Sequence, residues 1–333
     1  MAMSRKDRRL ERLRQKKLSY RSLEATENKP SVPVKKKKEY ANVFAKVYET
    51  QYKKLILIPI ILLVLAFVVI GMNVVTTGDF INKAVSLKGG LTLTISTEEL
   101  IDVVEFESFL SSQFLGSEIS VRELSELGVQ NGIIIESDIT SEQRDSFIST
   151  VEDKLGLDSE DFSIEEIGSS LGASFFKQTM IAVLFAFLFM GIVVFWYFRT
   201  LIPSGAVILA AFSDIIVTLA IVDIMGMKIG TAGVAAFLML IGYSVDTDIL
   251  LSTRVLKKTE GTVMSRIYDA MKTGLTMNLT TMVAVTIGLI VTDSEVIKQI
   301  MIILLVGLFV DIINTWIQNV GIIRYYLERK GKK

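Results

Sequence analysis

The sequence predicts a polytopic α-helical membrane protein with six transmembrane helices and one small α+β (ferredoxin-like) extracytoplasmic domain between spans one and two. Half of the 333 residues (50%) are hydrophobic and the mean hydropathy is positive. Several apolar runs approach the roughly 20 residues that a transmembrane helix needs. The charged residues are strongly segregated along the chain, although the formal net charge is +0.

Residues 1–54 are predicted to form a basic cytoplasmic tail, with a lysine run from Lys35 to Lys38. Basic residues beside a span set its orientation, so the simplest role of this tail is to keep the N-terminus in the cytoplasm. A contact with anionic lipid or ribosomal RNA is the alternative, and the composition does not separate the two. We expect membrane lipid as a partner and no specific nucleic acid.

The first transmembrane helix is predicted at residues 55–75. Its apolar run begins at Leu55, and Pro59 lies in the first turn, where a missing N–H is tolerated. The run is too long for the apolar core of a cleavable signal peptide. We therefore expect this span to act as its own insertion signal.

Residues 76–177 are predicted to form the extracytoplasmic α+β domain, in which acidic residues far outnumber basic ones. The hydrophobic period alternates between 2 and 3.6 residues along this segment. Strands are predicted at 91–95, 118–121, 132–136 and 162–167, and helices at 100–114 and 141–155, the latter with Ser141 as its N-cap. The resulting order, β-α-β-β-α-β, is typical of ferredoxin-like domains.

Residues 178–323 are predicted to form a bundle of five further spans, followed by a second basic cytoplasmic tail at 324–333. The spans are predicted at 179–198, 202–224, 229–251, 275–291 and 296–323. Basic residues gather in the loops on the side of the first tail, whereas Asp293 and Glu295 lie on the other side. The chain is therefore expected to be a multi-pass protein of the cytoplasmic membrane with both termini in the cytoplasm. Lys228 is the one basic residue that does not fit this pattern.

Four aspartates interrupt the predicted spans: Asp214 in the third, Asp246 and Asp248 in the fourth, and Asp311 in the sixth. An ionisable group in hydrocarbon costs at least about 2.5–3.5 kcal/mol, so each is a candidate functional residue. None has a basic residue within one helical turn of its own span. Each must therefore face protein or water, pair with another helix, or carry a proton.

Asp246 and Asp248 are separated by about 200° around a helix, so both cannot face the same partner. We expect Asp246 to face the bundle and Asp248 to reach Lys257, Lys258 or water at the cytoplasmic loop. The functional hypothesis is a proton relay that includes Asp214 and Asp246, with Asp248 and Asp311 as further candidates.

The alternative role for these aspartates is structural. They would then form hydrogen bonds between helices, with polar side chains elsewhere in the spans as partners. The candidate partners are Ser213, Tyr243, Ser244, Asn278, Thr280, Thr281 and Asn314.

The chain contains no histidine and no cysteine. This excludes Ser-His-Asp and Cys-His catalytic centres, Cys/His zinc sites, haem ligation by histidine, and disulfides. We therefore expect no catalytic residue, no metal site and no cofactor, and a protein that is not an enzyme. Any group that handles protons must be Asp, Glu, Lys, Tyr or water.

The segment 241–248, followed by Arg254, resembles the fourth-span signature of the SecD/SecF family in its archaeal-type form. The family consists of accessory subunits of the Sec protein translocase within the resistance-nodulation-division superfamily. The residues of the motif in this chain are Gly242, Tyr243, Ser244 and Arg254. The resemblance covers about residues 50–325.

Two further motifs carry the same resemblance. Gly89 and Gly90 resemble the double glycine that opens the family's extracytoplasmic domain, and Ser213-Asp214 resembles its third-span motif. One span, an outer domain and five more spans is also the layout of half a transporter of that superfamily.

The resemblance implies an accessory subunit of the Sec translocase that uses the proton gradient, with SecD, to promote preprotein export across the cytoplasmic membrane. The implied partners are SecD, the Sec translocon channel and unfolded preprotein. The family's proton-handling residues are a span-four aspartate and a span-five arginine. The arginine position holds Thr273 here and Lys272 lies beside it, so Lys272 joins the candidates for the relay.

Three other functions stay open. A proton-coupled exporter of lipid or small molecules would need a larger outer domain with a binding cleft. A passive scaffold for SecD is favoured by Thr273 at the arginine position. An intramembrane aspartyl protease would also use two buried aspartates, but the segment Tyr243-Ser-Val-Asp246 differs from the Gly-x-Gly-Asp typical of such enzymes.

Overall fold

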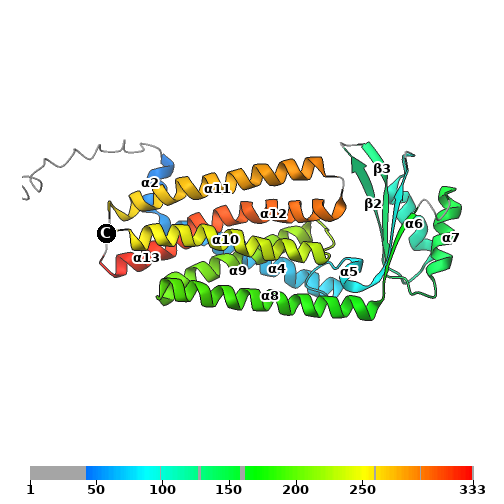
Figure 1. The fold of residues 1–333 in the computed structure, drawn as a ribbon, viewed down its shortest axis with the longest axis horizontal. Helices are drawn as coiled ribbons and strands as arrows, with labels where there is room; N and C mark the ends of the chain where they lie inside the picture. Colours follow the sequence, from blue (N-terminus) through cyan, green and yellow to red (C-terminus); the bar gives the residue numbers. More distant parts are fainter. Residues whose placement is uncertain are drawn as a thin grey trace, which may run out of the picture. The chain divides into compact units, whose positions relative to one another are not determined.

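The computed structural model in Figure 1 describes residues 43–97, 99–126, 129–157, 162–258, 260–292 and 294–331. Most of the predicted basic tail, including its lysine run, therefore lies outside the described residues, as do Asp293 and the last two residues. The chain divides into two units, Met1–Val47 and Tyr48–Lys333. Helix α2 (Val43–Thr50) crosses that boundary. The features described below belong to the second unit.

Six helical segments of the described chain are long and apolar enough to cross a membrane. The first comprises α3 (Tyr52–Leu55) and α4 (Leu57–Thr77). The next four are α8 (Ser169–Phe198), α9 (Leu201–Ile224), α10 (Thr231–Lys257) and α11 (Val263–Val291). The last consists of α12 (Glu295–Ile313), η2 (Asn314–Asn319) and α13 (Val320–Arg329). With the sheet domain described below, these segments confirm the predicted fold class.

Two of these helices begin well before the predicted apolar runs. Helix α8 starts at Ser169 rather than at residue 179, and its first turns pack on the short helix α5 (Val85–Lys88). Helix α11 starts after Thr262, whose hydroxyl accepts a hydrogen bond from the Ser265 N–H. The added turns are more polar than the spans, so hydrophobicity alone does not reveal them.

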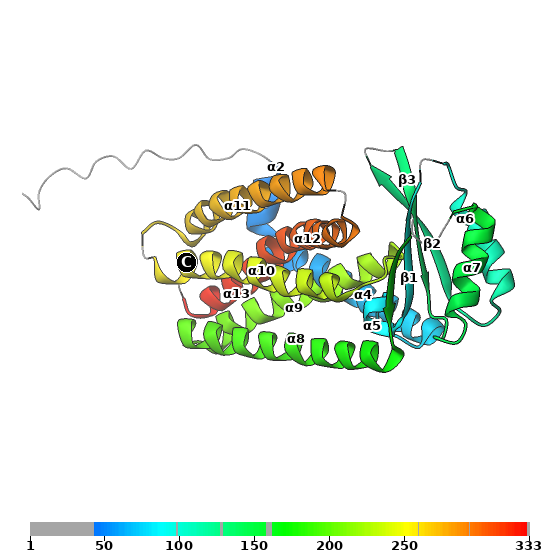
Figure 2. The ribbon, with the colours of Figure 1, turned by 45° about the vertical axis from the view of Figure 1, so that its right-hand side comes forward.

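The helices α9 and α10 form the interior of the bundle, and α12 packs against both of them. Figures 1 and 2 show these helices running side by side. Helices α4 and α8 leave most of their apolar side chains exposed. Such extended apolar faces are what a lipid environment requires, because lipid tails solvate them as well as a protein core does.

The segment between the first two spans forms an antiparallel sheet in the order β2-β3-β1-β4. Its elements are β1 (Gly90–Ser96), α6 (Val103–Gln113), β2 (Ile119–Glu126), β3 (Val129–Ser137), α7 (Arg144–Leu155) and β4 (Phe162–Ile167). Figure 2 shows α6 and α7 on the same side of this sheet. The connectivity is the predicted ferredoxin-like order.

The core of this domain follows from the period-2 pattern of the strands. Leu91, Leu93 and Ile95 alternate along β1, are almost fully buried, and pack with Phe106 of α6 and Phe147 of α7. Because successive side chains of a strand point to opposite faces, every second residue of β1 faces the two helices.

The predicted N-cap of α7 is wrong. The helix begins at Arg144 after Gln143, which makes no side-chain capping bond. Residues 141–143 form a turn, and the Ser141 hydroxyl donates to Glu166 of β4 at 2.9 Å. A serine that is not at the helix boundary is free to bond across the chain instead.

Lys228, the basic residue that did not fit the charge pattern, lies between α9 and α10 and faces the sheet domain. Its Nζ is 3.8 Å from Glu118 Oε1 and 3.7 Å from Glu136 Oε2. Lys88 binds the same acidic edge, at 2.6 Å from Glu118 and 3.0 Å from Asp138. The loop between α9 and α10 is thus joined to the sheet domain by ion pairs.

Candidate functional site

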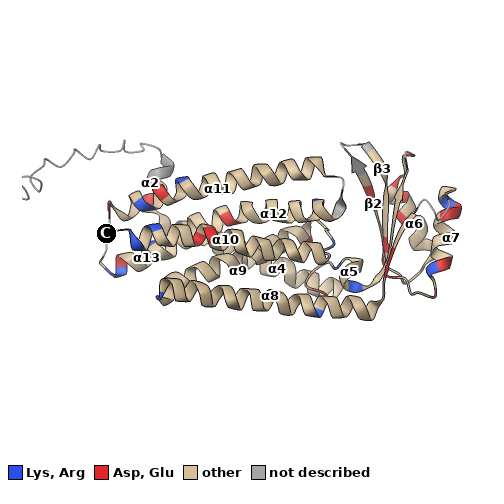
Figure 3. Cartoon of the chain, in the orientation of Figure 1, with Lys and Arg blue, Asp and Glu red and all other residues tan. Residues whose placement is uncertain are grey.

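Three aspartates lie buried where α9, α10 and α12 meet: Asp214, Asp248 and Asp311, all 0% exposed. Figure 3 shows acidic residues in red within the otherwise uncharged stretches of α10 and α12. Among the described residues, no Lys or Arg forms an ion pair with any of the three. We call Asp214, Asp248 and Asp311 the aspartate cluster.

Asp214 of α9 is bound by one hydroxyl and one amide. Ser244 Oγ donates to Asp214 Oδ2 at 2.5 Å, and Asn314 Nδ2 donates to Asp214 Oδ1 at 2.7 Å. The neighbouring Ser213 accepts from Gln318 at 3.3 Å. Asp214 therefore connects α9 to α10 and to the last helical segment.

Asp248 and Asp311 share one hydroxyl. Thr315 Oγ1 lies 2.9 Å from Asp248 Oδ1 and 3.0 Å from Asp311 Oδ1. Asn319 Nδ2 also donates to Asp248 Oδ1 at 2.6 Å, and Asn278 Nδ2 donates to Asp311 Oδ2 at 2.7 Å. A threonine hydroxyl carries one hydrogen and donates it to one acceptor. Both Thr315 contacts are hydrogen bonds only if one of the two carboxyl groups carries a proton.

One carboxylate oxygen of the cluster lacks a hydrogen-bond donor among the described residues. Asp248 Oδ2 is buried and accepts no hydrogen bond from the described residues. A buried acceptor without a donor is costly for an ionised carboxylate, by about 1–3 kcal/mol or more. The surroundings of Asp248 are therefore less suited to a fixed negative charge than those of Asp214.

A π-helical turn brings these donors to the cluster. Helix α12 continues through η2, a π-helix at Asn314–Asn319, before the α-helix resumes as α13. Asn314, Thr315 and Asn319 in this turn are all 0% exposed. π-turns insert one residue per turn and are frequent at functional sites. The predicted sixth span is an ordinary helix at these residues, because a π-turn has no hydrophobic period of its own.

The prediction that Asp246 faces the bundle is wrong. Asp246 is exposed, whereas Asp248 lies inside the bundle. The buried face of α10 contains Ser244, Leu251 and Ser252, and Asp248 falls on that face at helical spacing from them. The predicted contact of Asp248 with the cytoplasmic lysines is wrong as well, because its partners are on the last helical segment.

Of the motif residues on α10, Ser244 bonds a member of the aspartate cluster and the others do not. Gly242 and Tyr243 lie on the exposed side of the helix. Arg254 donates to the Asp269 carbonyl at 2.7 Å and so ties the end of α10 to α11. The exposed side chain of Lys272 forms no ion pair with another described residue. Its part in a relay stays a prediction.

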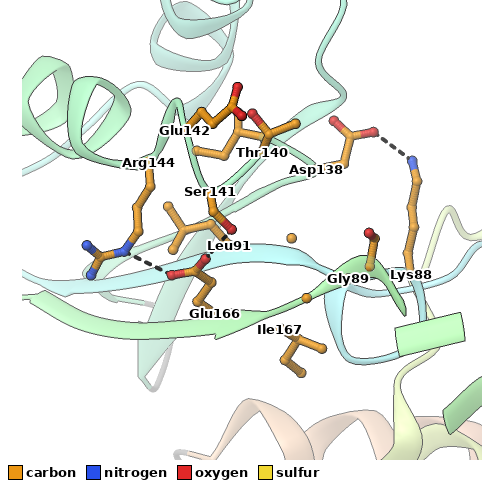
Figure 4. Close-up of a pocket in the computed structure, with 14 residues that line it drawn as sticks. Lys88, Gly89, Leu91, Asp138, Thr140, Ser141, Glu142, Arg144, Glu166 and Ile167 are labelled. Carbon is orange, nitrogen blue, oxygen red and sulfur yellow. Dashed lines mark hydrogen bonds and ion pairs between the residues drawn. The ribbon is translucent and has the colours of Figure 1, made fainter. Parts of the chain in front are cut away.

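The double glycine lies away from the cluster, at the start of β1. Gly89 has φ +88° and Gly90 has φ +133°, both unfavourable for a residue with a side chain. Figure 4 shows the cavity of about 510 Å³ that they line, in which Arg144 and Glu166 are paired at 3.0 Å. A Cβ on Gly89 would lie 2.4 Å from the Ser169 Cα. Gly89 thus allows the chain that enters β1 to pass close to the start of α8.

Sequence reasoning found part of the hydrogen-bond network and missed the rest. Ser244, Asn278 and Asn314 were among the expected partners of the aspartates, and each bonds one of them. Thr315 and Asn319 were not anticipated. The available signal was the four-residue spacing of Asp311, Thr315 and Asn319, which places polar groups on one face of an apolar helix.

Replacing Thr315 by valine is expected to destabilise the protein by about 1–3 kcal/mol, because two buried carboxyl groups lose a shared donor while the side-chain shape is kept. Thermal unfolding in detergent measures the change. The matched control is Thr280→Val in α11, where the exposed hydroxyl bonds only carbonyls of its own helix. Equal effects of the two substitutions would contradict the bridging role of Thr315.

The fold and the site define a class of protein: a polytopic membrane protein with buried carboxylates in its bundle and a ferredoxin-like domain between the first two spans. Residues 148–329 match the family model described as "Protein export membrane protein SecD/SecF, C-terminal". The chain belongs to the SecD/SecF family of protein-export membrane proteins.

Two archaeal proteins are similar to the chain over most of their length. The protein-export membrane protein SecF of Methanocaldococcus jannaschii is 39% identical over 291 residues, which cover 85% of this chain and 98% of that protein. SecF of Pyrococcus furiosus is 34% identical over 291 residues, covering 86% of this chain and 95% of that protein.

A solved structure shows the same fold. The structure of SecDF from Thermus thermophilus, described as a translocon-associated membrane protein, superposes with a TM-score of 0.66 at 18% identity. The match covers 86% of this chain and 39% of that longer chain. A second SecDF structure, in a super-membrane-facing form, matches with a TM-score of 0.53 at 19% identity.

Proposed function

We propose that the chain is an accessory subunit of the Sec translocase that uses the proton gradient, together with SecD, to promote preprotein export across the cytoplasmic membrane. The observation that carries the proton-coupled part is the aspartate cluster, whose members Asp248 and Asp311 share the single hydroxyl of Thr315. The export role itself follows from the family.

The cluster can hold and move a proton. A proton on either Asp248 or Asp311 allows both contacts of Thr315 to be hydrogen bonds, and its transfer reverses the direction of donation. Asp214 extends the site toward α9, since its Oδ1 accepts from Asn314, the residue that directly precedes Thr315 in the π-turn. Without a proton, two carboxylates would compete for one donor in a buried site that no described cation neutralises, which is costly.

Movement of the helices would reach the outer domain through the loop between α9 and α10. Lys228 in that loop is paired with Glu118 and Glu136 of the sheet domain. The loop also pairs with the segment that leads into the domain, since the Ala84 N–H donates to the Ile229 carbonyl at 3.0 Å. A shift of α9 against α10 therefore displaces groups that hold the domain.

The exposed side of α10 supports a membrane partner. Met239, Gly242, Tyr243 and Asp246 lie on this side, and Asp246 is a carboxylate within the segment expected to span the membrane. Contact of such a group with lipid tails is unfavourable by a few kcal/mol, so a second protein that covers it stabilises the assembly. We assign this side of α10 to contact with SecD.

The proposed orientation of the chain in the membrane follows from the distribution of its charged residues. The basic tails place both termini in the cytoplasm and the acidic sheet domain outside, and the first tail contacts anionic lipid. Preprotein and the Sec channel are the remaining partners, with no specific nucleic acid. We propose no catalytic, cofactor or metal-dependent activity, in keeping with the absence of histidine and cysteine from the sequence.

The test is reconstitution with SecD and the channel in vesicles, with export measured in the presence and absence of a proton gradient. The wild type is expected to export more with the gradient, and Asp214→Asn is expected to lose that increment while still forming the complex. A wild type that exports equally in both conditions would refute the proton-coupled role.

A passive scaffold for SecD is the second candidate. It is favoured by the three asparagine amides that donate to the aspartates, because interhelical hydrogen bonds of this kind stabilise a bundle without any proton transfer. The same reconstitution separates the two functions. A scaffold predicts that removing the chain lowers export equally with and without the gradient.

A further inference from the structure

The segment that precedes the first span is fastened to the π-turn beside the aspartate cluster. The Tyr48 hydroxyl donates to the Trp316 carbonyl at 2.6 Å, across 268 positions in the sequence. Trp316 lies within η2, directly after Thr315, the residue that bridges Asp248 and Asp311. A residue inside the predicted basic tail of residues 1–54 therefore contacts the backbone of the site.

The π-turn leaves the Trp316 carbonyl without the backbone donor that it would have in an α-helix. In an α-helix the Val320 N–H would donate to the Trp316 carbonyl, four residues earlier. Here the Val320 N–H donates to the carbonyls of Thr315 and Ile317 instead. The Trp316 carbonyl has lost its α-helical donor, and the Tyr48 hydroxyl provides a donor from outside the helix. Buried carbonyl groups are rarely left without a donor.

Trp316 is also held through its ring. The ring packs against Gly274 of α11, where an added Cβ would lie 2.4 Å from the indole. The tryptophan is buried, with an exposed fraction of 4%. Its backbone is bound by Tyr48 and its side chain occupies the space left by a glycine, so its position in the turn is fixed from two sides.

Residues 48–52 are themselves anchored on α13. The Arg324 guanidinium donates to the Tyr48 carbonyl at 3.1 Å and to the Glu49 carbonyl at 2.9 Å. It also lies 4.1 Å from the centre of the Tyr52 ring, whose hydroxyl donates to Glu328 at 2.5 Å. Burial raises the pKa of the Tyr48 hydroxyl, which therefore remains a donor. Residues 48–52 are therefore held against α13 by specific hydrogen bonds and a cation–π contact.

We propose that Tyr48 is a positioning residue of the aspartate cluster: its hydroxyl holds the π-turn, and the π-turn keeps Thr315 and Asn319 against Asp248. If the hydroxyl leaves, the Val320 N–H can return to the Trp316 carbonyl and the turn can become α-helical. The parts of the helix on either side then rotate against each other by about 100°, the angle of one residue. Thr315 and Asn319 can no longer both bind Asp248.

The inference rests on the proposed function, because it concerns the control of the same site from the cytoplasmic side. A partner or lipid surface that pulls residues 48–52 away from α13 would release the π-turn. The proton path through Thr315 would then be interrupted, because the bridge between Asp248 and Asp311 would be lost. The tail thus acts on the cluster through one hydrogen bond.

The test is Tyr48→Phe in the full chain, with Tyr52→Phe as the matched control. Both substitutions remove one phenol oxygen from the same segment, but only the first removes the bond to the π-turn. The first readout is hydrogen exchange of the backbone amides at residues 316–321 in detergent, followed by mass spectrometry. Tyr48→Phe is expected to accelerate it about three- to tenfold, the size of one lost hydrogen bond, and Tyr52→Phe is expected to leave it unchanged.

The second readout is gradient-dependent export in the reconstituted complex. Tyr48→Phe is expected to lower it about three- to tenfold and to leave gradient-independent export as in the wild type. Wild-type exchange in the turn for Tyr48→Phe would overturn the inference, and so would equal losses in both tyrosine variants. If the wild type shows no gradient-dependent export, the proposed function fails, and the exchange experiment still decides whether Tyr48 holds the turn.

Discussion

Replacing Asp248 by asparagine is expected to abolish the gradient-dependent part of export and to preserve the fold. The asparagine oxygen can take the place of Asp248 Oδ1, which accepts from both Asn319 and Thr315, while its amide takes the place of Oδ2, which accepts no hydrogen bond from the described residues. The variant therefore keeps the hydrogen bonds of the cluster but has no titratable group at this position. We expect at least a tenfold loss of the gradient-dependent increment in the reconstituted system, with gradient-independent export unchanged.

Asp246→Asn is the matched control for this result. It is the same chemical change two residues away on the same helix, but Asp246 is exposed and outside the cluster. Export is measured per assembled complex with SecD, because the side of α10 that carries Asp246 is assigned to that contact. The control is expected to retain the increment. Loss of the increment in Asp246→Asn, together with its retention in Asp248→Asn, would reverse the assignment of the two aspartates.

Replacing Gly90 by alanine is expected to destabilise the sheet domain by roughly 3–5 kcal/mol, the sum of backbone strain and steric overlap. Gly90 has φ +133°, and an added Cβ would lie 2.2 Å from the Ser137 carbonyl oxygen on the neighbouring strand. Neither β1 nor β3 can move away without breaking their ladder, in which Leu91 pairs with Ser137. Denaturant unfolding of the full chain, followed by circular dichroism, measures the loss.

Gly116→Ala separates the two contributions. Gly116 also has a positive φ, +92°, but an added Cβ would meet nothing within 4 Å. This variant is expected to cost only the backbone strain, about 1–2 kcal/mol. Similar losses for the two alanine variants would show that the close approach at Gly90 contributes nothing. The double glycine would then have to be explained by its cavity rather than by packing.

Much of the architecture follows from local patterns that the chain carries in its own sequence. Long apolar runs predicted the spans. The period-2 alternation of Leu91, Leu93 and Ile95 predicted a strand with one buried face, which the structure has. The N-terminal extension of α11 was missed, because residues 263–274 mix polar and charged side chains with apolar ones rather than being uniformly apolar. The Ser141 cap was missed because several residues near a helix start can serve as its boundary, and only the formed turn selects one.

The site was less accessible to such reasoning. The sequence showed that Asp246 and Asp248 point in different directions, but the rotation of α10 about its axis depends on the helices that pack around it. The donors of Thr315 and Asn319 reach Asp248 through a π-turn, whose cause is not a local pattern. It is stabilised by the Tyr48 hydroxyl and by the space at Gly274, both distant in sequence.

The amino-acid sequence by itself determined the number of spans, the presence of a ferredoxin-like domain and the burial of carboxylates in the bundle, because hydrophobic period and charge placement act over short distances. The tertiary structure alone decided which aspartates meet, which hydroxyl joins them, and which segment holds that hydroxyl in place. Those contacts join residues tens to hundreds of positions apart, and their geometry exists only once the helices have packed against one another.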